Sequence, residues 1–308
     1  MTSRRLIVSL LLIAMISIAA IPSPSLVQPQ TQAQMVLLHV RVMDVNGRAV
    51  ADVPQSSFQI TEDGVPQQIQ LFLNKEIPLS YGLVIDNSGS LHEHIDKVLD
   101  ASIRIVNSNT AADETFIIRF VSSDKIETFQ EPTSNKDLLI EGLKGLYIEG
   151  GQTAVIDAVY LSAEKLAKVK SDVANPRRKV MVLVTDGEDR DSYYREKDLL
   201  KLLNAYESQI YIIGLTELVK PDKRDKALRL LRRLAGETGG RLFLPSSPRE
   251  LDRIADDIIN DIRTQYVIGY VPTSSSKDFH KVQVTIADSP NQEKRIAVTR
   301  VGYSTPAK

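Results

Sequence analysis

Two uninterrupted apolar runs constrain the fold of this chain more than any other feature of its sequence. Residues 83–85 are Leu-Val-Ile and lead into Asp86, and residues 180–184 are Val-Met-Val-Leu-Val and lead into Thr185-Asp186. A strand without polar alternation is typically buried on both faces, as in a parallel sheet covered by helices on both sides. Ligands of such sheets bind beyond the carboxyl ends of the strands. Asp86 and Asp186 are therefore predicted to lie at a binding edge.

Hydroxyl side chains accompany these two carboxylates. Ser88 and Ser90 follow Asp86 at a spacing of two residues, on the turn between a buried strand and a predicted helix. Thr153 follows Gly150-Gly151 at the start of another predicted helix. Ligand sets made only of oxygen suit Mg²⁺, Ca²⁺ or Mn²⁺ better than zinc. A Ser-rich turn that merely caps a helix is the alternative interpretation of the first motif taken alone.

The order of these residues resembles a known binding motif. An Asp-x-Ser-x-Ser sequence, a threonine after a glycine pair and an aspartate in a Thr-Asp-Gly turn follow one another as in the metal-ion-dependent adhesion site of von Willebrand factor type A (VWFA) domains. The matching residues here are Asp86, Ser88, Ser90, Thr153 and Asp186. The resemblance covers residues 78–263, and the flanks resemble a bacterial secreted group often called VWFA-related.

The resemblance implies that the five residues contribute to metal binding in different ways. The three hydroxyls would bind the metal directly, and the two carboxylates would act mostly through bound water. One coordination position would stay open for the carboxylate of a partner protein. The implied ion is Mg²⁺, with Mn²⁺ or Ca²⁺ possible.

Alternation of strands and helices between residues 78 and 263 predicts an α/β domain with a doubly wound, Rossmann-like, mostly parallel sheet. The gap at 122–124 is too short for a parallel crossover, so the strands beside it are predicted to form an antiparallel hairpin. Apolar residues at helical spacing predict helices starting near Leu91, near Ile156 and, with Ser247 as cap and Pro248 in first position, before Leu251. The predicted strands are 81–85, 115–121, 125–130, 180–184, 210–215 and 241–244.

Both flanks of this region have the two-residue alternation of half-buried strands. Three short strands cannot easily fold alone, so we expect the two flanks to pair into a smaller β-sandwich-like module. Two independent β appendages are the alternative. The predicted organisation is 1–20 signal peptide, 21–35 flexible tether, 36–77 first part of the β module, 78–263 type A domain and 264–303 second part of the β module.

Composition narrows the possible functions. The chain has 308 residues, a formal net charge of −1 and no cysteine. The charge gives no electrostatic reason to expect nucleic acid as a partner. Without cysteine there is no disulfide, thiolate metal site or cysteine nucleophile. A phosphate-binding P-loop is not expected either, because the segment at Gly150-Gly151 lacks the required lysine.

The amino terminus is typical of an export signal. Arg4 and Arg5 precede an uncharged apolar run over residues 6–20, which ends in small residues suited to cleavage. The run is shorter than a spanning helix of about 20 residues, although an uncleaved anchor is an alternative. The general secretory route is favoured over a twin-arginine route, because the run is strongly apolar. A periplasmic, cell-surface or secreted location is expected.

Two further motifs have alternative interpretations. His92 and His94 lie near the Asp86 motif, but a spacing of two points them to different sides of a helix, so solvated side chains are expected rather than a zinc pair. Asp44-x-Asn46-Gly47 is similar to the start of a calcium loop but lacks its distant glutamate, so a hairpin turn is expected.

Charged residues gather in two other segments. Glu188, Asp189 and Asp191 are expected to form a solvated acidic loop, with a second cation site as the alternative. The segment after Pro221 is basic, and its charges are expected to form the solvated side of an amphipathic helix, with a partner-docking face as the alternative. Its cations are Lys223, Arg224, Lys226, Arg229, Arg232 and Arg233.

The sequence therefore predicts an exported, non-enzymatic protein that captures an Asp or Glu side chain of a partner protein at a metal-occupied site. Contact with a membrane is expected only through an uncleaved signal anchor. Two other functions stay open. One is a metal-dependent hydrolase, for which His92, His94 or Glu188 would be the general base. The other is an envelope scaffold or assembly factor with a purely structural metal site.

Overall fold

A computed structural model describes residues 35–172, 174–273, 278–288 and 293–304 of the chain. Within these ranges, no helix has both the length and the apolar character needed to cross a membrane. The predicted signal peptide and all of the predicted tether except Met35 lie outside the described residues.

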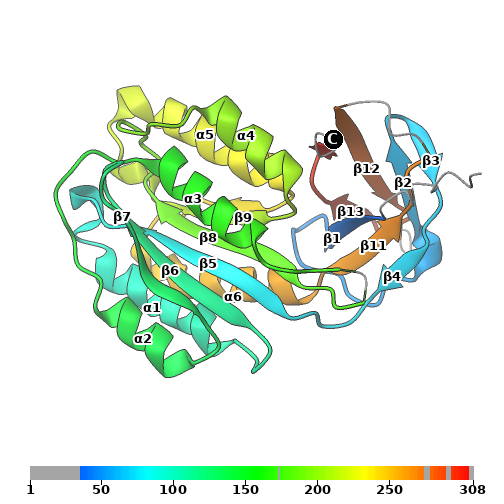
Figure 1. The fold of residues 1–308 in the computed structure, drawn as a ribbon, viewed down its shortest axis with the longest axis horizontal. Helices are drawn as coiled ribbons and strands as arrows, with labels where there is room; N and C mark the ends of the chain where they lie inside the picture. The colour runs from blue at the N-terminus through cyan, green and yellow to red at the C-terminus, as the bar shows by residue number, and fades with distance from the viewer. Residues whose placement is uncertain (1–34, 173, 274–277, 289–292, 305–308) are drawn as a thin grey trace, which may run out of the picture. The chain divides into compact units, whose positions relative to one another are not determined.

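A six-stranded sheet forms the centre of the larger part of the chain (Figure 1). Neighbouring strands are parallel except at one edge, where the last two pair in antiparallel fashion across a short turn, as predicted. The order across the sheet is β10 (Arg241–Phe243), β9 (Gln209–Gly214), β8 (Arg178–Thr185), β5 (Leu79–Asp86), β6 (Glu114–Phe120) and β7 (Ile126–Thr133). The predicted mostly parallel α/β sheet is thus confirmed.

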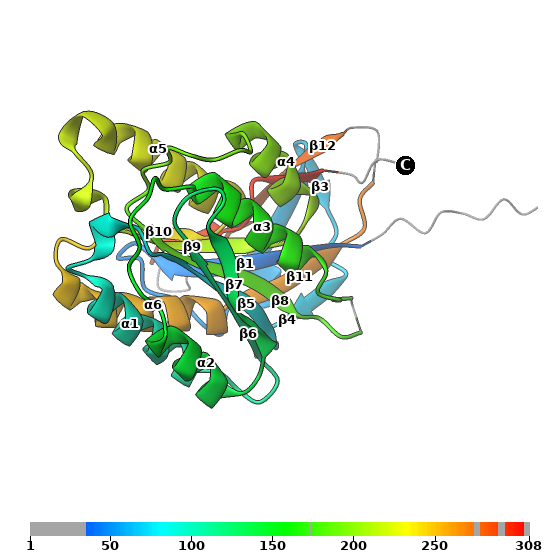
Figure 2. The same ribbon diagram turned by 60° about the vertical axis from the view of Figure 1, so that its left-hand side comes forward.

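Helices cover both faces of this sheet (Figures 1 and 2). One face packs against α1 (Ile95–Asn107), α2 (Lys136–Lys144) and α6 (Leu251–Arg263). The other packs against α3 (Val155–Ala167), α4 (Glu196–Ala205) and α5 (Pro221–Thr238). Every residue of β5 is buried, which explains why residues 83–85, directly before Asp86, are all apolar. Short 3₁₀ turns lie at η1 (Gln55–Ser57), η2 (Gly89–Leu91), η3 (Thr216–Leu218) and η4 (Pro248–Glu250).

Two predicted helix starts were wrong in detail. Leu91 does not begin α1; it ends the 3₁₀ turn η2, and the α-helix starts at Ile95. The 3₁₀ turn contains Ser90, the last residue of the Asp86 motif, so both serines lie before the α-helix and not in its first turn. Pro248 begins η4 rather than α6, and the Ser247 side chain makes no capping hydrogen bond.

The two flanks form a second, antiparallel structure from two four-stranded sheets. One sheet contains β13 (Arg295–Val298), β1 (Val36–Asp44), β11 (Tyr266–Tyr270) and β4 (Leu71–Leu73). The other contains β14 (Gly302–Ser304), β12 (Phe279–Ile286), β2 (Phe58–Glu62) and β3 (Val65–Gln67). Each sheet takes strands from both flanks, and the two share one apolar core. The flanks are therefore one β-sandwich-like module, called the β module below, and not two appendages.

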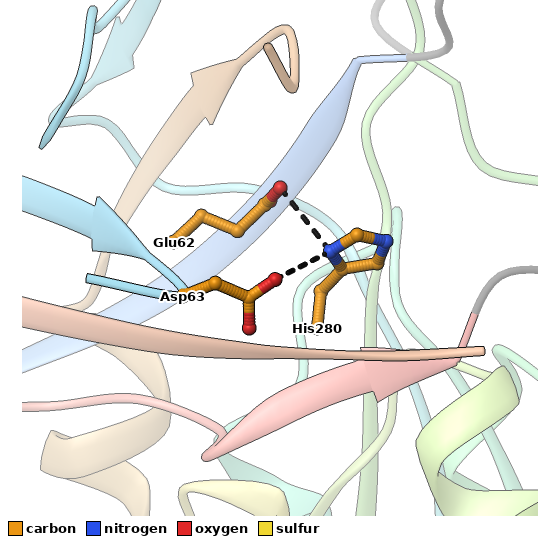
Figure 3. Close-up of side chains that lie close together, drawn as sticks. All are labelled: Glu62, Asp63 and His280. Atoms are coloured by element: carbon orange, nitrogen blue, oxygen red, sulfur yellow. Dashed lines mark hydrogen bonds and ion pairs between the residues drawn. The ribbon is translucent and has the colours of Figure 1, made fainter. Parts of the chain in front are cut away.

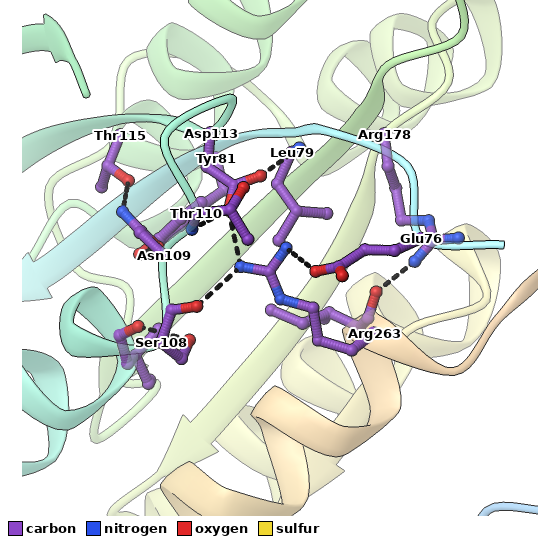
Figure 4. Close-up of polar contacts among 12 residues, drawn as sticks. Glu76, Leu79, Tyr81, Ser108, Asn109, Thr110, Asp113, Thr115, Arg178 and Arg263 are labelled. Atoms are coloured by element: carbon purple, nitrogen blue, oxygen red, sulfur yellow. Dashed lines mark hydrogen bonds and ion pairs between the residues drawn. The ribbon is translucent and has the colours of Figure 1, made fainter.

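A polar network fastens the amino-terminal end of the parallel sheet (Figure 4). The fully buried Asp113 accepts hydrogen bonds from the backbone nitrogens of Leu79 and Thr110, each at 2.7 Å, and pairs with Arg263 at 2.7 Å. Arg178, buried at the start of β8, donates to the carbonyl oxygens of Ile262 and Gln265. The network joins the end of α6 to the starts of β5 and β8, and leaves the opposite end of the sheet for the candidate site.

Candidate metal centre

Asp86 is the last residue of β5 and is fully buried. Its Oδ1 accepts a hydrogen bond from the Ser88 nitrogen at 2.9 Å, and its Oδ2 accepts one from Thr185 Oγ1 at 2.7 Å. The first bond closes the turn that carries the serines, and the second crosses to the neighbouring strand β8. Asp86 is therefore fixed in orientation from both sides.

The two serines lie side by side on this turn. Ser88 Oγ and Ser90 Oγ are 3.0 Å apart, and the Ser88 hydroxyl lies close enough to Asp86 to favour its ionised form. Ser88 is buried and Ser90 is exposed. The pair thus extends from the buried carboxylate to the solvent, as an accessible ligand set requires.

Asp186 follows β8 and is almost completely buried. Its Oδ1 accepts a hydrogen bond from the Glu188 nitrogen at 2.9 Å, and the Ser90 hydroxyl lies close enough to its carboxyl group to favour the ionised form. Gly187 has a φ of +83°, and a Cβ atom there would lie 2.8 Å from Leu231. Only glycine fits this turn without strain. The side chains of Asp86, Ser88, Ser90 and Asp186 thus form one continuous set of contacts.

Thr153 joins the site through its backbone. Its carbonyl oxygen accepts hydrogen bonds from the nitrogens of Arg190 at 2.8 Å and Asp191 at 3.2 Å, which ties it to the loop after Asp186. The next residue, Ala154, donates to the carbonyl oxygen of Val121 at the end of β6. These bonds place Thr153 at the carboxyl end of the sheet with the other four residues, although on a separate loop.

Charge is poorly balanced at this edge. Burial, together with the nearby charge of Asp186, raises the pKa of Asp86 to about 7. Burial also raises the pKa of Asp186. Two neighbouring buried carboxyl groups are difficult to ionise at the same time. A divalent cation bound between them would favour the ionised form of both. The donors are carboxylate and hydroxyl oxygens, so the residues fit Mg²⁺, Mn²⁺ or Ca²⁺.

The acidic loop after Asp186 differs from the sequence-based expectation. Glu188 is buried and pairs with Arg190 and with Lys223 of α5, the latter at 3.0 Å. The Arg190 guanidinium, more than Lys223, lowers the pKa of Glu188 to about 2. Asp189 is partly buried and accepts from the Ile156 nitrogen at 3.1 Å and Ser192 Oγ at 2.6 Å. The prediction of a solvated loop was wrong for both residues, because their charges hold the loop against α3 and α5.

Two other predictions concern groups outside the site. His92 is exposed, as expected, and His94 is half-buried. Asp44 and Gly47 close a hairpin turn through the bond from Gly47 N to Asp44 O at 3.0 Å, and Gly47 has a φ of +77°. The hairpin interpretation is confirmed.

Sequence reasoning missed two residues that support the site. Thr185 holds Asp86, as described above. Asp157 of α3 is buried and accepts hydrogen bonds from the nitrogens of Tyr193 and Tyr194, both at 2.8 Å, and from Ser123 Oγ at 2.5 Å. The sequence did contain a signal for Asp157, because it is an aspartate on the otherwise apolar face of a predicted helix.

A groove adjoins the site. Gln152 and Gly187, which neighbour Thr153 and Asp186 in the chain, form part of its wall. The groove is rich in cationic side chains. These are Arg190 and, on α5, Lys223, Lys226, Arg229 and Arg233. Several of these are paired with carboxylates, as Lys223 is with Glu188 and Arg233 with Glu196.

Comparison with known proteins gives the following matches. A structure of BatB from Bacteroides thetaiotaomicron is 15% identical, with 58% of this chain and 97% of that chain covered and a TM-score of 0.45. An aerotolerance-related membrane protein from Bacteroides fragilis is 17% identical, with 59% and 98% covered and a TM-score of 0.46. A von Willebrand factor type A protein from Catenulispora acidiphila is 12% identical, with 90% and 76% covered and a TM-score of 0.49.

The search of curated proteins found no match. The family model of the von Willebrand factor type A domain matches residues 82–257, which is more than half of the 308 residues. The matched region begins within β5 and ends within α6, so it includes all five candidate metal ligands. The chain belongs to the von Willebrand factor type A domain family.

Proposed function

We propose that this protein is an exported, non-enzymatic binding protein that captures an Asp or Glu side chain of a partner at a Mg²⁺-occupied site. The observation that carries the proposal is the continuous contact of Asp86, Ser88, Ser90 and Asp186 at the carboxyl edge of the sheet. Thr153 would complete the ligand set from its own loop. Because the chain contains a type A domain, protein binding is the class of function that we propose.

The ligand types favour capture of an anion. Three hydroxyl oxygens are neutral, and the two carboxylates already accept hydrogen bonds from Thr185 and from backbone nitrogens. An ion held in this way keeps most of its positive charge and attracts an anionic ligand to an open position. Mg²⁺ in proteins commonly keeps waters and takes one or two carboxylates. A partner carboxylate would replace one of these waters.

The same surroundings argue against a hydrolase. Glu188, one of the alternative bases, forms ion pairs with Arg190 and Lys223. The Arg190 guanidinium lowers its pKa to about 2, far from the value near working pH that suits a general base. His92 is exposed on the turn after η2, and among the described residues no hydrogen bond orients its imidazole. Partner binding therefore explains the site better than water activation does.

The basic groove next to the site supports an acidic partner surface. Lys226 and Arg229 are exposed on α5 and line this groove. Cations around a carboxylate-binding position would steer an acidic segment toward the metal and would make its association rate fall with added salt. The sequence expectation of a merely solvated helix face is compatible with this use, since steering charges need to be solvated before binding.

The proposed location is the cell envelope or the exterior. It rests on the charged start, apolar run and small residues of the first 20 positions. An envelope scaffold or assembly factor whose metal is purely structural is the second candidate. This second candidate predicts that chelation unfolds the protein and that no partner binding depends specifically on the metal.

A metal-dependent capture experiment tests the proposal. Purified protein would be immobilised, exposed to envelope extract with Mg²⁺, and washed with EDTA. We expect the same protein band to elute from the wild type in EDTA and to be missing with Ser90→Ala. Ser134→Ala changes an exposed serine next to α2 and is the matched control, which should retain the band. Partner retention that is insensitive to EDTA and to Ser90→Ala would contradict carboxylate capture.

A further inference from the structure

A second group of potential metal ligands lies in the β module, away from the five residues of the type A site (Figure 3). Glu62 and Asp63 lie at the end of β2, and His280 lies on the adjacent strand β12. His280 Nδ1 is 3.0 Å from Asp63 Oδ2 and 3.4 Å from Glu62 Oε1. Each residue offers one ligand atom, and the three atoms lie within 4.8 Å of one another.

Hydrogen bonds orient both carboxylates toward one point. Glu62 Oε2 accepts from the hydroxyls of Tyr270 at 2.5 Å and Tyr303 at 2.8 Å, which leaves Oε1 facing His280. Asp63 Oδ1 accepts from the Lys281 nitrogen at 3.0 Å, which leaves Oδ2 facing His280. Metal ligands in proteins are commonly held by hydrogen bonds of this kind to their other atoms.

Burial makes the charge of this group costly. Glu62 and His280 are both buried, and Asp63 keeps 20% of its side chain exposed. Burial, followed by the hydrogen bond to Glu62, raises the pKa of Tyr270 and of Tyr303, so both tyrosines remain protonated donors. A divalent cation would neutralise both carboxylates and leave the imidazole neutral.

The spacing of the ligand atoms suits a particular ion. Zinc takes nitrogen and oxygen ligands at about 2.0–2.1 Å in a tetrahedron, which separates neighbouring ligand atoms by about 3.3 Å. The two distances from His280 Nδ1, 3.0 and 3.4 Å, bracket that value. An imidazole nitrogen also favours zinc over magnesium, which prefers oxygen ligands only.

We propose that Glu62 Oε1, Asp63 Oδ2 and His280 Nδ1 form a zinc site that is separate from the type A metal centre, with a water as fourth ligand. The partly exposed Asp63 gives the ion and the water access to solvent. The ligands come from both flanks of the type A domain, 217 residues apart in sequence for Asp63 and His280. Zinc would therefore cross-link the two halves of the β module and stabilise it.

Zinc titration of the untagged, EDTA-treated protein in the Asp186→Asn background tests this proposal, because that background removes a ligand of the type A site. We expect one equivalent of Zn²⁺ to bind and to raise the melting temperature. Adding Asp63→Asn should weaken zinc binding about 100-fold or more, since changes even in supporting residues cost 10- to 100-fold. His92→Gln, outside the group, is the matched control and should leave zinc binding unchanged.

Cobalt gives a second readout that does not depend on stability. Co²⁺ bound to one nitrogen and several oxygens in a tetrahedral site should give visible absorption in the Asp186→Asn protein, and this absorption should vanish with Asp63→Asn. Far-ultraviolet circular dichroism would verify that Asp63→Asn is folded; if it is not, Glu62→Gln replaces it.

Absence of zinc binding in the Asp186→Asn background would overturn the proposal. Zinc binding that neither Asp63→Asn nor Glu62→Gln weakens would also overturn it. In either case the three residues form a hydrogen-bonded cluster that does not bind zinc. Because Mg²⁺ binding by the wild type is measured separately, failure here leaves the proposed function of the type A site intact. Loss of Mg²⁺ binding would likewise leave the zinc site intact.

Discussion

Thr185 Oγ1 donates a hydrogen bond of 2.7 Å to Asp86 Oδ2 across the neighbouring parallel strands β8 and β5. The same hydroxyl accepts from the Gly187 nitrogen at 3.0 Å. One buried threonine therefore joins the two acidic turns of the candidate metal site. Thr185 immediately precedes Asp186 in the chain, so it links the turn of Asp86 to the turn of Asp186.

Thr185→Val tests this connection. Valine has nearly the same shape but cannot hydrogen-bond, so Asp86 loses one of its fixed partners. We expect Mg²⁺ affinity to fall about 10- to 100-fold, and the free energy of unfolding to fall by about 1–3 kcal/mol. Calorimetric titration and denaturant unfolding measure the two quantities. Thr128→Val on the edge strand β7 is the matched control, and an equal loss of affinity there would contradict the assigned role of Thr185.

Asp86→Asn tests the electrostatics of the site. The folded-state pKa of Asp86 is raised from 3.8 to about 7 by burial and by Asp186, so the folded protein binds this proton more tightly than the unfolded chain does. Metal-free wild type should therefore lose stability as pH rises from about 4 to about 7, by at most about 4 kcal/mol. Asp86→Asn in EDTA should show a flatter profile over this range. Parallel profiles for the two proteins would refute the buried-charge argument.

Asp113→Asn tests the opposite end of the sheet. Burial opposes ionisation of Asp113, but the hydrogen bonds from Arg263 and from two backbone nitrogens outweigh it and lower its pKa. This contribution to stability is present above the ordinary carboxyl pKa and is lost as pH falls through the lowered value. We expect Asp113→Asn to cost about 3 kcal/mol at pH 7 and to reduce the acid sensitivity of unfolding. Mg²⁺ affinity should not change, since Asp113 lies at the far end of β5.

Export gives a fourth prediction. The mature protein should begin between Ala20 and Met35, because the apolar run ends in small residues before a segment rich in Pro, Gln and Ser. Mass spectrometry of protein isolated from its native cells measures the mature terminus. A soluble cytoplasmic species that retains Met1 would show that this segment does not direct export.

The sequence predicted those parts of the structure that depend on local pattern. The apolar runs and the alternating flanks placed the strands, and the order of Asp86, Ser88, Ser90, Thr153 and Asp186 selected the family. Contacts that depend on packing between elements were missed. Thr185 reaches Asp86 only because β8 and β5 are adjacent and in register, which no local pattern reveals.

Two other outcomes show the same limit. Glu188 was expected to be solvated because its neighbours are acidic, but one of its cations, Lys223, comes from α5, 35 residues away. Glu62, Asp63 and His280 looked unremarkable in sequence, since they meet only when β2 pairs with β12. The whole type A domain lies between these two strands in the sequence.

The most direct test of the central claim is the change in unfolding free energy when Mg²⁺ is added to metal-free protein. Binding to the folded state alone stabilises it by about 2.7 kcal/mol at a hundredfold excess over Kd. At that Mg²⁺ concentration we expect the full stabilisation in the wild type, a smaller one in Thr153→Ala, which lacks one neutral oxygen, and none in Asp186→Asn. Equal stabilisation of all three proteins would contradict a Mg²⁺ site at these residues.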